Sequence, residues 1–309
     1  MKKPNIELSL PVGNVSTAAN LGAYYQDFTQ AIEHFEKCYF GEFDKNGIPL
    51  SGFGDDAYYN LIFIIQYGII LHDLILKGEN IEKNKLELTK CFNWIDQTKI
   101  ETENTIYWEN EKASERYSLK EKWVSGMYQG QTISLYLRYG QLFNCEADCI
   151  EKTKKMINFY DVDFENGGFK RIDSDGNLWF EEYTSPSPSF VLNGYIYCLF
   201  GVYDYWRVTG CRDAKKIIVE CEKTLINSLH KYDCGYWSIY DQLIRELATK
   251  YYHKNIHIPL MEIMYGLTKN ELFNYYKKRW EKQYNSKINH IFVEIMYRVR
   301  PRMKLLFKK

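Results

Sequence analysis

Two adjacent carboxylates and a phenol occur together in residues 178–200, LWFEEYTSPSPSFVLNGYIYCLF. Glu181 and Glu182 precede Tyr183, and all three side chains can accept or donate a proton. A carboxylate pair partly shielded by neighbouring aromatic rings raises the pKa of one member toward neutrality. These residue types indicate proton transfer to or from a bound molecule, although two acids at a helix start also suit a simple interaction with the helix dipole.

A rigid turn follows these acids. Pro186 and Pro188 cannot lie inside a helix, so the chain reaches the next apolar helix in extended form, with Ser187 or Ser189 as the expected N-cap. The acids are then held at a mouth formed by loops, beside a helix start whose free backbone N–H groups and Asn193 face an anion. The turn predicts a binding site for a ligand that carries a carboxylate.

His253 and His257 are further candidates for chemistry, since an i, i+4 pair can share one helical face as metal ligands do. No glutamate follows His253, and no acidic third ligand is marked nearby. The eight cysteines lack the paired short spacings of a zinc site, and we expect them to be reduced and buried. We therefore predict no metal and no cofactor, and we expect a histidine to bind a substrate carboxylate.

Repeating helix pairs are the elements that must position these residues. Apolar segments begin near residues 59, 123 and 189, and each carries an amide side chain close to a glycine: Gln66 with Gly68, Gln129 with Gly130, and Asn193 with Gly194. A polar amphipathic helix and a loop rich in Gly, Asn and aromatic residues follow each segment. The interval between the amides, from 66 to 129 and from 129 to 193, fits two helices and a loop.

Apolar inner helices that alternate with amphipathic outer helices predict an all-α fold, an (α/α) toroid whose loops gather around a central cleft. An αα-solenoid that binds other proteins is the alternative, and the dissimilar, aromatic-rich loops favour the toroid. We assign residues 1–30 to an N-terminal extension, 31–285 to the toroid and 286–309 to a basic C-terminal tail. Residues 34–50 resemble the end of an earlier repeat, and residues 267–285 resemble the outer helix of a last one.

Composition restricts the class of function. The 309 residues contain 40 Lys and Arg and 40 Asp and Glu, so no overall charge attracts the chain to nucleic acid, which we exclude as a partner. Aromatic residues make up 17%, with 27 Tyr, and such rings suit clefts that hold a polar ligand with an apolar face. The N-terminus lacks the apolar core of a signal peptide, and no stretch is long enough to span a membrane, so we expect a soluble cytoplasmic protein.

Five short motifs occur in the order and spacing of one known family: QYG at 66–68, QGQ at 129–131, EEY at 181–183, PSFVLNG at 188–194 and IYD at 239–241. Together with the downstream segment YYHKNIHI, they make residues 58–280 resemble the C-terminal α-helical domain of the D-glucuronyl C5-epimerases, which act on heparosan and heparan sulfate precursors. Animal members carry a β-rich domain before the helical one, and this chain is too short to include that domain in full.

The resemblance implies an epimerase that inverts carbon-5 of D-glucuronate to L-iduronate, or the reverse, in a uronic-acid polysaccharide or its precursor. One group removes the proton next to the carboxylate, the site stabilises the enolate, and a second group returns a proton to the opposite face. The catalytic residues implied are Glu182, Tyr183, Tyr240 and Tyr252. The substrate-binding residues implied are Glu181, Asn193, Gln129, Gln131, Tyr67, Arg245, His253, His257 and Trp237.

Two departures from the family pattern bear on these assignments. Leu243 occupies the position where animal enzymes have an arginine, and Arg245 lies two residues further on. The segment HKNIHI is one residue longer than the usual spacing, which leaves Tyr252 or Tyr251 as the second proton carrier. A polysaccharide lyase, a glycoside hydrolase and a non-catalytic glycan-binding module remain alternatives on the same fold.

Basic residues are concentrated at the C-terminus among apolar ones: Arg298, Arg300, Arg302, Lys304, Lys308 and Lys309. Such a tail suits peripheral contact with an anionic membrane at its inner face or with a glycosyltransferase assembly, and it equally suits a solvated chain end. The family resemblance also implies a homodimer.

Overall fold

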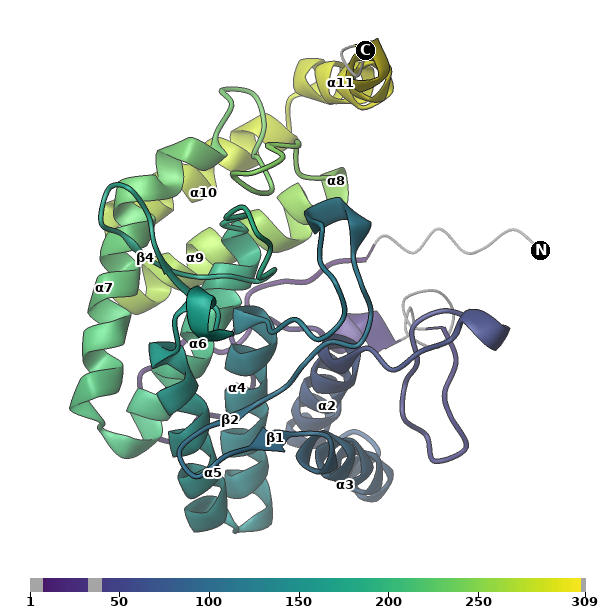
Figure 1. Cartoon of the computed structure of the whole chain (residues 1–309), viewed down its shortest axis with the longest axis vertical. Helices are drawn as coiled ribbons and strands as arrows, with labels where there is room; N and C mark the ends of the chain where they lie inside the picture. The colour runs from purple at the N-terminus through teal and green to yellow at the C-terminus, as the bar shows by residue number, and fades with distance from the viewer. Residues whose placement is uncertain (1–7, 33–40, 307–309) are drawn as a thin grey trace.

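The computed structural model describes residues 8–32 and 41–306, and helices dominate this part of the chain (Figure 1). Three successive pairs each join an apolar helix to a more polar one. They are α2 (Leu61–Leu76) with α3 (Ile81–Gln97), α4 (Gly126–Phe143) with α5 (Glu146–Asn158), and α6 (Leu192–Thr209) with α7 (Arg212–Ser228). The three helix pairs predicted from the repeat are confirmed.

A fourth unit follows on the C-terminal side. It consists of α8 (Lys250–Tyr252), a π-helix labelled η8 (His253–His257), α9 (Ile258–Thr268) and α10 (Glu271–Tyr284). The outer helix predicted in residues 267–285 is α10. A π-turn accommodates one more residue per turn than a regular α-helix does, and η8 places such a turn within the HKNIHI segment.

A long helix, α11 (Lys287–Leu306), occupies most of the predicted basic tail, and Lys308 and Lys309 lie outside the described residues. Short elements fill the loops between the helix pairs. Two small antiparallel hairpins pair β1 (Ile100–Glu101) with β2 (Ile106–Tyr107) and β3 (Lys170–Ile172) with β4 (Leu178–Phe180). The 3-10 helices are η1 (Thr29–Ala31), η3 (Gly54–Asp56), η4 (Glu115–Tyr117), η5 (Phe159–Asp161), η6 (Phe164–Asn166) and η7 (Leu229–Tyr232).

The inner helices α4 and α6 pack with their backbones unusually close. A Cβ atom at Gly130 would lie 2.5 Å from the Cα of Cys198, and one at Gly201 would lie 2.3 Å from the carbonyl oxygen of Gly130. Only glycine permits this approach, which explains the small residues in the apolar segments. Both helices are buried along most of their length, whereas α5 and α7 bury one face only.

The N-terminal segment 8–32 lies across the helices and belongs to the main core. The backbone N–H of Tyr24 donates to the Asp73 carboxylate on α2, at 3.1 Å, and the side-chain amide of Gln26 donates to the carbonyl of Asn255 in η8, at 2.5 Å. This segment therefore connects the first helix pair to the fourth unit. The proposed boundaries at residues 30 and 285 stay predictions, as does the earlier repeat in residues 34–50, because residues 34–40 lie outside the described part.

A buried charge network fixes the same segment. Asp204 on α6 accepts from Arg138 Nη1 at 2.5 Å, from Arg207 Nη1 at 3.0 Å and from the Tyr25 hydroxyl at 2.8 Å. The side chains of Asp204 and both arginines have no exposed surface. The guanidinium groups also donate to backbone carbonyls of the segment, including that of Ala18 at 2.8 Å. Such a network stabilises a structure when every partner is present.

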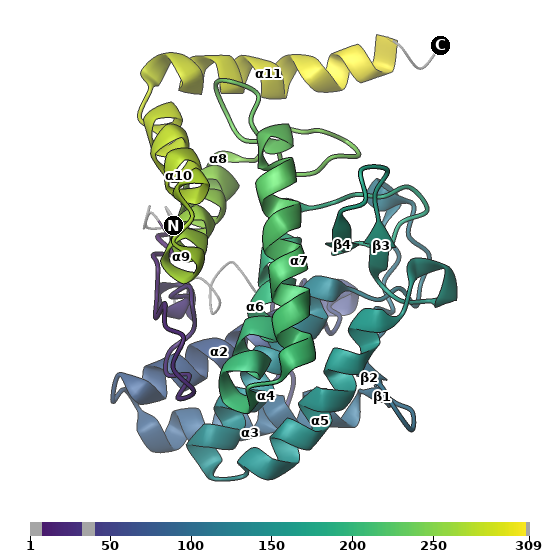
Figure 2. The ribbon, with the colours of Figure 1, turned by 90° about the vertical axis from the view of Figure 1, so that its left-hand side faces the viewer.

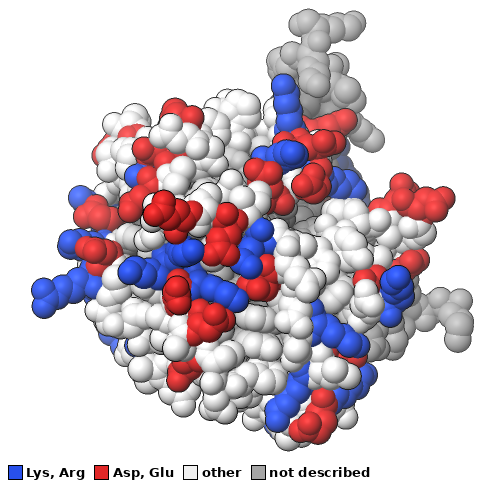
Figure 3. Space-filling view, turned by 60° about the horizontal axis from the view of Figure 1, so that its bottom comes forward, with Lys and Arg blue, Asp and Glu red and all other residues white. Residues whose placement is uncertain are grey.

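Charged side chains of both signs are mixed over the face shown in Figure 3, in keeping with the zero formal net charge. The described cysteines are free thiols, and Cys91, Cys149, Cys198 and Cys221 are buried. Among the described helices, none combines the length and the apolar character needed to cross a membrane.

Candidate active site

Glu182 lies in the loop between β4 and α6, with only 4% of its surface exposed. Its carboxyl group is packed against the first turn of α6, where the side-chain amide of Asn193 donates to Oε2 at 3.4 Å. A Cβ atom at Gly194 would lie 2.2 Å from the same oxygen. The glycine is therefore required for close approach, and the helix start that was expected to face a ligand anion instead receives the Glu182 carboxyl.

Glu181 holds the proline-rich turn in place. Its carboxylate accepts from the backbone N–H of Ser189 at 3.0 Å, from the Ser189 hydroxyl at 2.7 Å and from the backbone N–H of Phe190 at 3.0 Å. Arg171 Nε lies 3.5 Å away. Phe190 adopts a left-handed conformation with φ of 43°, which these bonds help to maintain. The predicted helix cap at Ser187 or Ser189 is wrong, because Val191 is the N-cap of α6 and Ser189 serves Glu181 instead.

Burial raises the pKa of both carboxyl groups from 4.5 to about 7. For Glu182, the negative charges of Glu181 and Asp241 act in the same direction, whereas a hydrogen bond with Tyr183 lowers the pKa. The donors and the guanidinium around Glu181 hold its carboxyl group against the turn. Glu182 has fewer donors and titrates near neutrality, as a group that both takes and returns a proton must.

Tyrosine rings enclose Glu182. Burial raises the pKa of Tyr128, Tyr183 and Tyr240, and the nearby Glu182 carboxylate raises each of them further. Tyr183 is also hydrogen-bonded to Tyr240 and stacks on Tyr117, with ring centroids 4.3 Å apart. These phenols are therefore protonated at neutral pH and act as hydrogen-bond donors around the carboxylate.

Tyr252 completes this group from the fourth unit. Its ring meets that of Tyr240 edge to face, with centroids 5.1 Å apart. The charge of Tyr252 is among the influences that raise the pKa of Tyr128, Tyr183 and Tyr240. Glu182, Tyr183, Tyr240 and Tyr252, which the sequence predicts as catalytic residues, are thus brought together.

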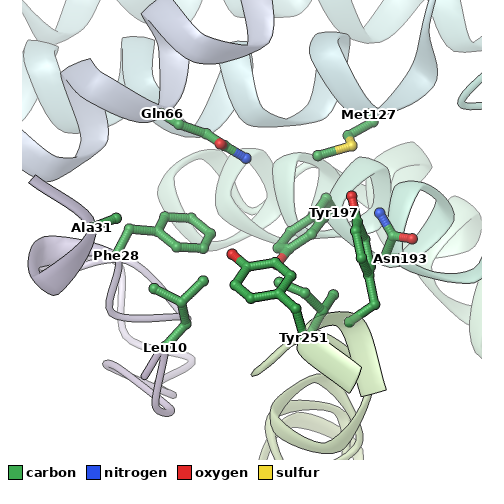
Figure 4. Close-up of a pocket in the computed structure, with 10 residues that line it drawn as sticks. Leu10, Phe28, Ala31, Gln66, Met127, Asn193, Tyr197 and Tyr251 are labelled. Carbon is green, nitrogen blue, oxygen red and sulfur yellow. The ribbon is translucent and has the colours of Figure 1, made fainter. Parts of the chain in front are cut away.

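A pocket at the centre of the helices adjoins the site, and all four helical units contribute to it (Figure 4). The rings of Phe28, Tyr197 and Tyr251 surround its interior in this view. The lining residues are Gln66 of α2, Met127 of α4, Asn193 and Tyr197 of α6, Tyr251 and Tyr252 of α8, Ile256 of η8, and Leu10, Phe28 and Ala31 of the N-terminal segment. The Asn193 Oδ1 atom is buried without a partner among the described residues.

A larger cleft of about 470 Å³ opens on the other side of Tyr128 and Tyr183. Its walls carry the aromatic rings and amides typical of carbohydrate sites, including Trp94, Trp108 and Trp123. Lys112 lies over the Tyr58 ring, 3.8 Å from its centroid, and adds a cation to this wall. The cleft is lined by Tyr128 and Tyr183 and so reaches the tyrosines around Glu182.

Sequence reasoning missed Arg116, the cation beside the tyrosines. Its guanidinium lies 5.5 Å from the ring centroids of both Tyr117 and Tyr240, and its Nη2 atom is 3.1 Å from Glu246. Arg116 lowers the pKa of Glu182, and Tyr117 donates to Asp241 at 3.1 Å. A basic residue directly before a tyrosine in a long loop was the one available signal. Arg245 is exposed and bonds to Gln242 at 2.9 Å instead.

Several predicted binding residues have internal partners. Gln129 donates to the carbonyls of Ile106 and Met156, at 2.7 and 3.0 Å, and so ties α4 to β2 and α5. The Tyr67 hydroxyl donates to Glu87 on α3, at 3.3 Å. Gln131 is fully buried and accepts from Gln66, at 3.3 Å. Trp237 is buried, and its indole N–H donates to the carbonyl of Ala248 at 2.7 Å. These bonds hold the four side chains within the fold, and their assignment to substrate binding stays a prediction.

The two histidines are the first and last residues of η8, and both rings contact Trp280 on the outer helix α10. Both rings are within hydrogen-bond distance of the Ser238 hydroxyl through Nδ1, at 2.7 and 2.8 Å, and Nε2 of His253 is 3.0 Å from the carbonyl of Trp280. Burial lowers the pKa of His253 to about 4 and that of His257 to about 3, so both are neutral at physiological pH. Within residues 8–32 and 41–306, no cluster of three or more His, Cys, Asp or Glu is placed to hold a metal ion.

We expect Gly194→Ala to lower catalytic turnover by at least about tenfold, because the new methyl group displaces the Glu182 carboxyl that lies against this position. Gly68→Ala is the matched control. Gly68 lies on α2, and its new Cβ would lie 2.9 Å from a side-chain carbon of Leu135 on α4. Turnover of both variants and their thermal unfolding are measured. A Gly194→Ala protein with unchanged turnover would show that Glu182 need not occupy this position.

Comparisons with known proteins agree with this arrangement. A family model described as "D-glucuronyl C5-epimerase C-terminus" matches residues 101–282. An uncharacterised protein of Methanocaldococcus jannaschii is 31% identical over 170 residues, which cover 54% of each chain. A D-glucuronyl C5-epimerase of Caenorhabditis elegans is 28% identical over 185 residues, 54% of this chain and 30% of that protein. The matches thus span about half of one relative and less than a third of the other, and all the clustered tyrosines fall within the matched family span.

Proposed function

This chain belongs to the D-glucuronyl C5-epimerase C-terminal family, and we propose that it inverts carbon-5 of a uronic-acid unit in a polysaccharide or its precursor. The observation that carries the proposal is the buried Glu182 carboxyl, whose pKa is about 7 and which is surrounded by protonated tyrosines. One group that takes a proton near pH 7 and others that give one are the parts that epimerisation needs. The substrate polymer and the direction of the reaction belong to the proposal.

The first step removes the carbon-5 proton. The Glu182 carboxylate takes it, and the electron pair left on carbon-5 spreads into the sugar carboxylate to form an enediolate. Hydrogen bonds from phenols and the nearby Arg116 guanidinium stabilise the added charge. The loop geometry holds Glu182 rigidly, since Glu181 fixes the turn and Gly194 leaves space for the carboxyl.

The second step returns a proton to the other face of the same carbon. Tyr252 gives its phenolic proton to carbon-5 and becomes a phenolate, and the electron pair of the enediolate forms the new C–H bond. Glu182 then gives its proton to water, and the Tyr252 phenolate takes a proton from water, beside the hydrogen-bonded hydroxyls of Tyr183 and Tyr240. These exchanges restore both groups and leave a solvent proton on carbon-5 in each turnover, so that no oxidant, metal or cofactor takes part in the proposed cycle.

The arrangement of the helix pairs around the central pocket supports the same proposal. We infer that the helix pairs form an (α/α) toroid, because residues of all four helical units and of the N-terminal segment line one central pocket. The aromatic cleft beyond Tyr183 then receives neighbouring sugars of a polymer. A homodimer and a cytoplasmic location remain predictions.

Incubation in heavy water tests the function directly. We expect the protein to incorporate deuterium at carbon-5 of a non-sulfated glucuronic-acid polymer, heparosan being the first choice, without shortening the chain. Nuclear magnetic resonance of the recovered polymer measures the label. An unsaturated product would identify a lyase, new reducing ends a hydrolase, and an unchanged polymer that nevertheless binds a glycan-binding module. Each of these three results contradicts the epimerase proposal.

A further inference from the structure

The outer surface of α11 carries a continuous row of exposed apolar side chains. The exposed fractions are 66% for Ile288, 61% for Ile291, 55% for Phe292, 49% for Ile295 and 38% for Val299. Their spacing places all five on one helical face. Isolated exposed apolar residues are ordinary on protein surfaces, whereas a row of five large ones is typical of a surface that contacts another phase or molecule.

The opposite face of the helix is already occupied by the protein. Val293 is fully buried, and the Tyr297 hydroxyl donates to the carbonyl of Ala248 at 2.6 Å. Glu294 forms an ion pair with Lys250 at 2.5 Å. These contacts fix the rotation of α11, so the apolar row faces away from the body. Figure 2 shows the helix lying across one end of the molecule and extending past it.

The charge of this segment is strongly positive, in contrast to the balanced chain. Residues 287–309 contain seven basic residues and a single acid, Glu294, which is paired. The basic residues are Lys287, Arg298, Arg300, Arg302, Lys304, Lys308 and Lys309. An apolar helical face flanked by lysine and arginine is the composition of helices that lie in a membrane interface.

We propose that α11 binds the surface of an anionic lipid bilayer, with the apolar row between the headgroups, and that the excess of basic residues in this part of the sequence attracts it to the anionic surface. The positive charge of residues 287–309 favours an anionic bilayer as the partner of this surface. A second copy of the helix would bring two strongly positive segments together, and mutual repulsion opposes that pairing. A soluble acidic polymer would satisfy the basic residues but leave the apolar row in water. The inference does not depend on the proposed catalytic activity.

Flotation with vesicles tests the proposal on the full-length protein. We expect it to float with vesicles of phosphatidylcholine and phosphatidylglycerol at 3:1 and not with pure phosphatidylcholine, and to bind less as salt is raised. Ile291→Ser/Ile295→Ser should lower the bound fraction at least about tenfold, since both side chains lose their burial in lipid. Arg298→Gln/Arg302→Gln should also weaken binding. Leu86→Ser, at a 59% exposed position on α3, is the control and should bind normally.

The remaining outcomes overturn the proposal. Absence of flotation with anionic vesicles does so directly. Concentration-dependent dimers that form without lipid, and that Ile291→Ser/Ile295→Ser abolishes, would assign the row to a second copy. Flotation that is insensitive to Ile291→Ser/Ile295→Ser and is displaced by a soluble polyuronate would assign the basic residues to an acidic polymer. Thermal unfolding of each variant verifies that the body of the protein is folded.

Discussion

Glu182→Gln is expected to lower the rate of carbon-5 exchange by at least about 100-fold, the contribution of a positioned acid–base group. Glutamine keeps the size of the side chain and can still meet Asn193, but it cannot take a proton. The rate is measured as deuterium incorporation into a glucuronic-acid polymer. Glu115→Gln, at an exposed position in the loop before Tyr117, is the control and should retain the full rate.

The same substitution should change stability in a pH-dependent way. Burial raises the pKa of Glu182 to about 7 from 4.5, so the folded state binds this proton more tightly than the unfolded state does. The resulting stabilisation is complete below pH 4.5 and is lost as the pH rises through 7. At pH 8, the free energy of unfolding of Glu182→Gln should therefore exceed that of the natural protein by on the order of 1 to 3 kcal/mol, and its unfolding temperature should be higher. At pH 4.5 the two proteins should differ little in stability.

These two measurements together identify the role of Glu182. If Glu182→Gln has a lower exchange rate but equal or higher stability at pH 8, Glu182 is needed for catalysis and does not stabilise the fold at that pH. A rate within threefold of the natural protein would rule out Glu182 as the base. Loss of both rate and stability would indicate that the carboxylate mainly holds the loop, as Glu181 does.

Tyr252→Phe should reduce exchange by a similar factor, about 100-fold, because it removes the proton that reaches carbon-5 from the second face. If Glu182 and Tyr252 serve opposite faces, each variant should affect one direction more. Release of carbon-5 label from glucuronate and from iduronate, measured separately, should then decline unequally in the two variants.

Tyr251→Phe is the matched control for this prediction. Tyr251 precedes Tyr252 on α8 and also lines the central pocket, whereas the ring that meets Tyr240 edge to face is that of Tyr252. We expect a loss of less than about tenfold. A larger loss for Tyr251→Phe than for Tyr252→Phe would reverse the assignment of the second carrier while leaving the reaction intact.

The helix pairs could be predicted from the sequence because their signals are local. Apolar segments with a glycine after each amide, followed by amphipathic segments, define α2 to α7, and the polar period of residues 267–285 defines α10. The N-terminal segment gave no such signal. Its position depends on distant partners, such as Asp73 for the Tyr24 backbone and Asp204 for the Tyr25 hydroxyl, which periodicity cannot reveal.

The site was predictable to the extent that it lies in short motifs. Glu182, Tyr183, Tyr240 and Tyr252 come from three motifs and meet around one carboxylate. Arg116 and Tyr117 were missed because they reach this point from a loop without a pattern. Adjacent residues also differ in ways that sequence alone does not show, since Glu181 binds the turn whereas Glu182 faces the tyrosines.

The roles of the amide and imidazole side chains were the hardest to predict from the sequence. Gln129 and His253 are polar residues in apolar segments, and such residues either serve a ligand or satisfy buried backbone groups. Both have internal partners here, the carbonyls of Ile106 and Trp280. The distinction depends on how neighbouring helices pack against each other, and for the two histidines the π-helical turn η8 sets the direction of their side chains.

The buried network of Arg138, Asp204 and Arg207 has a consequence for where this domain can be cut. Its partners include backbone carbonyls before residue 23, far outside the matched span of residues 101–282. A fragment restricted to that span would keep Arg138, Asp204 and Arg207 but lose the Tyr25 hydroxyl and those carbonyls, and each buried polar group left without its partner costs roughly 1 to 3 kcal/mol. The span matched by the family model is thus smaller than the folded unit. A truncation or fusion designed from that span alone would remove residues that belong to the buried core.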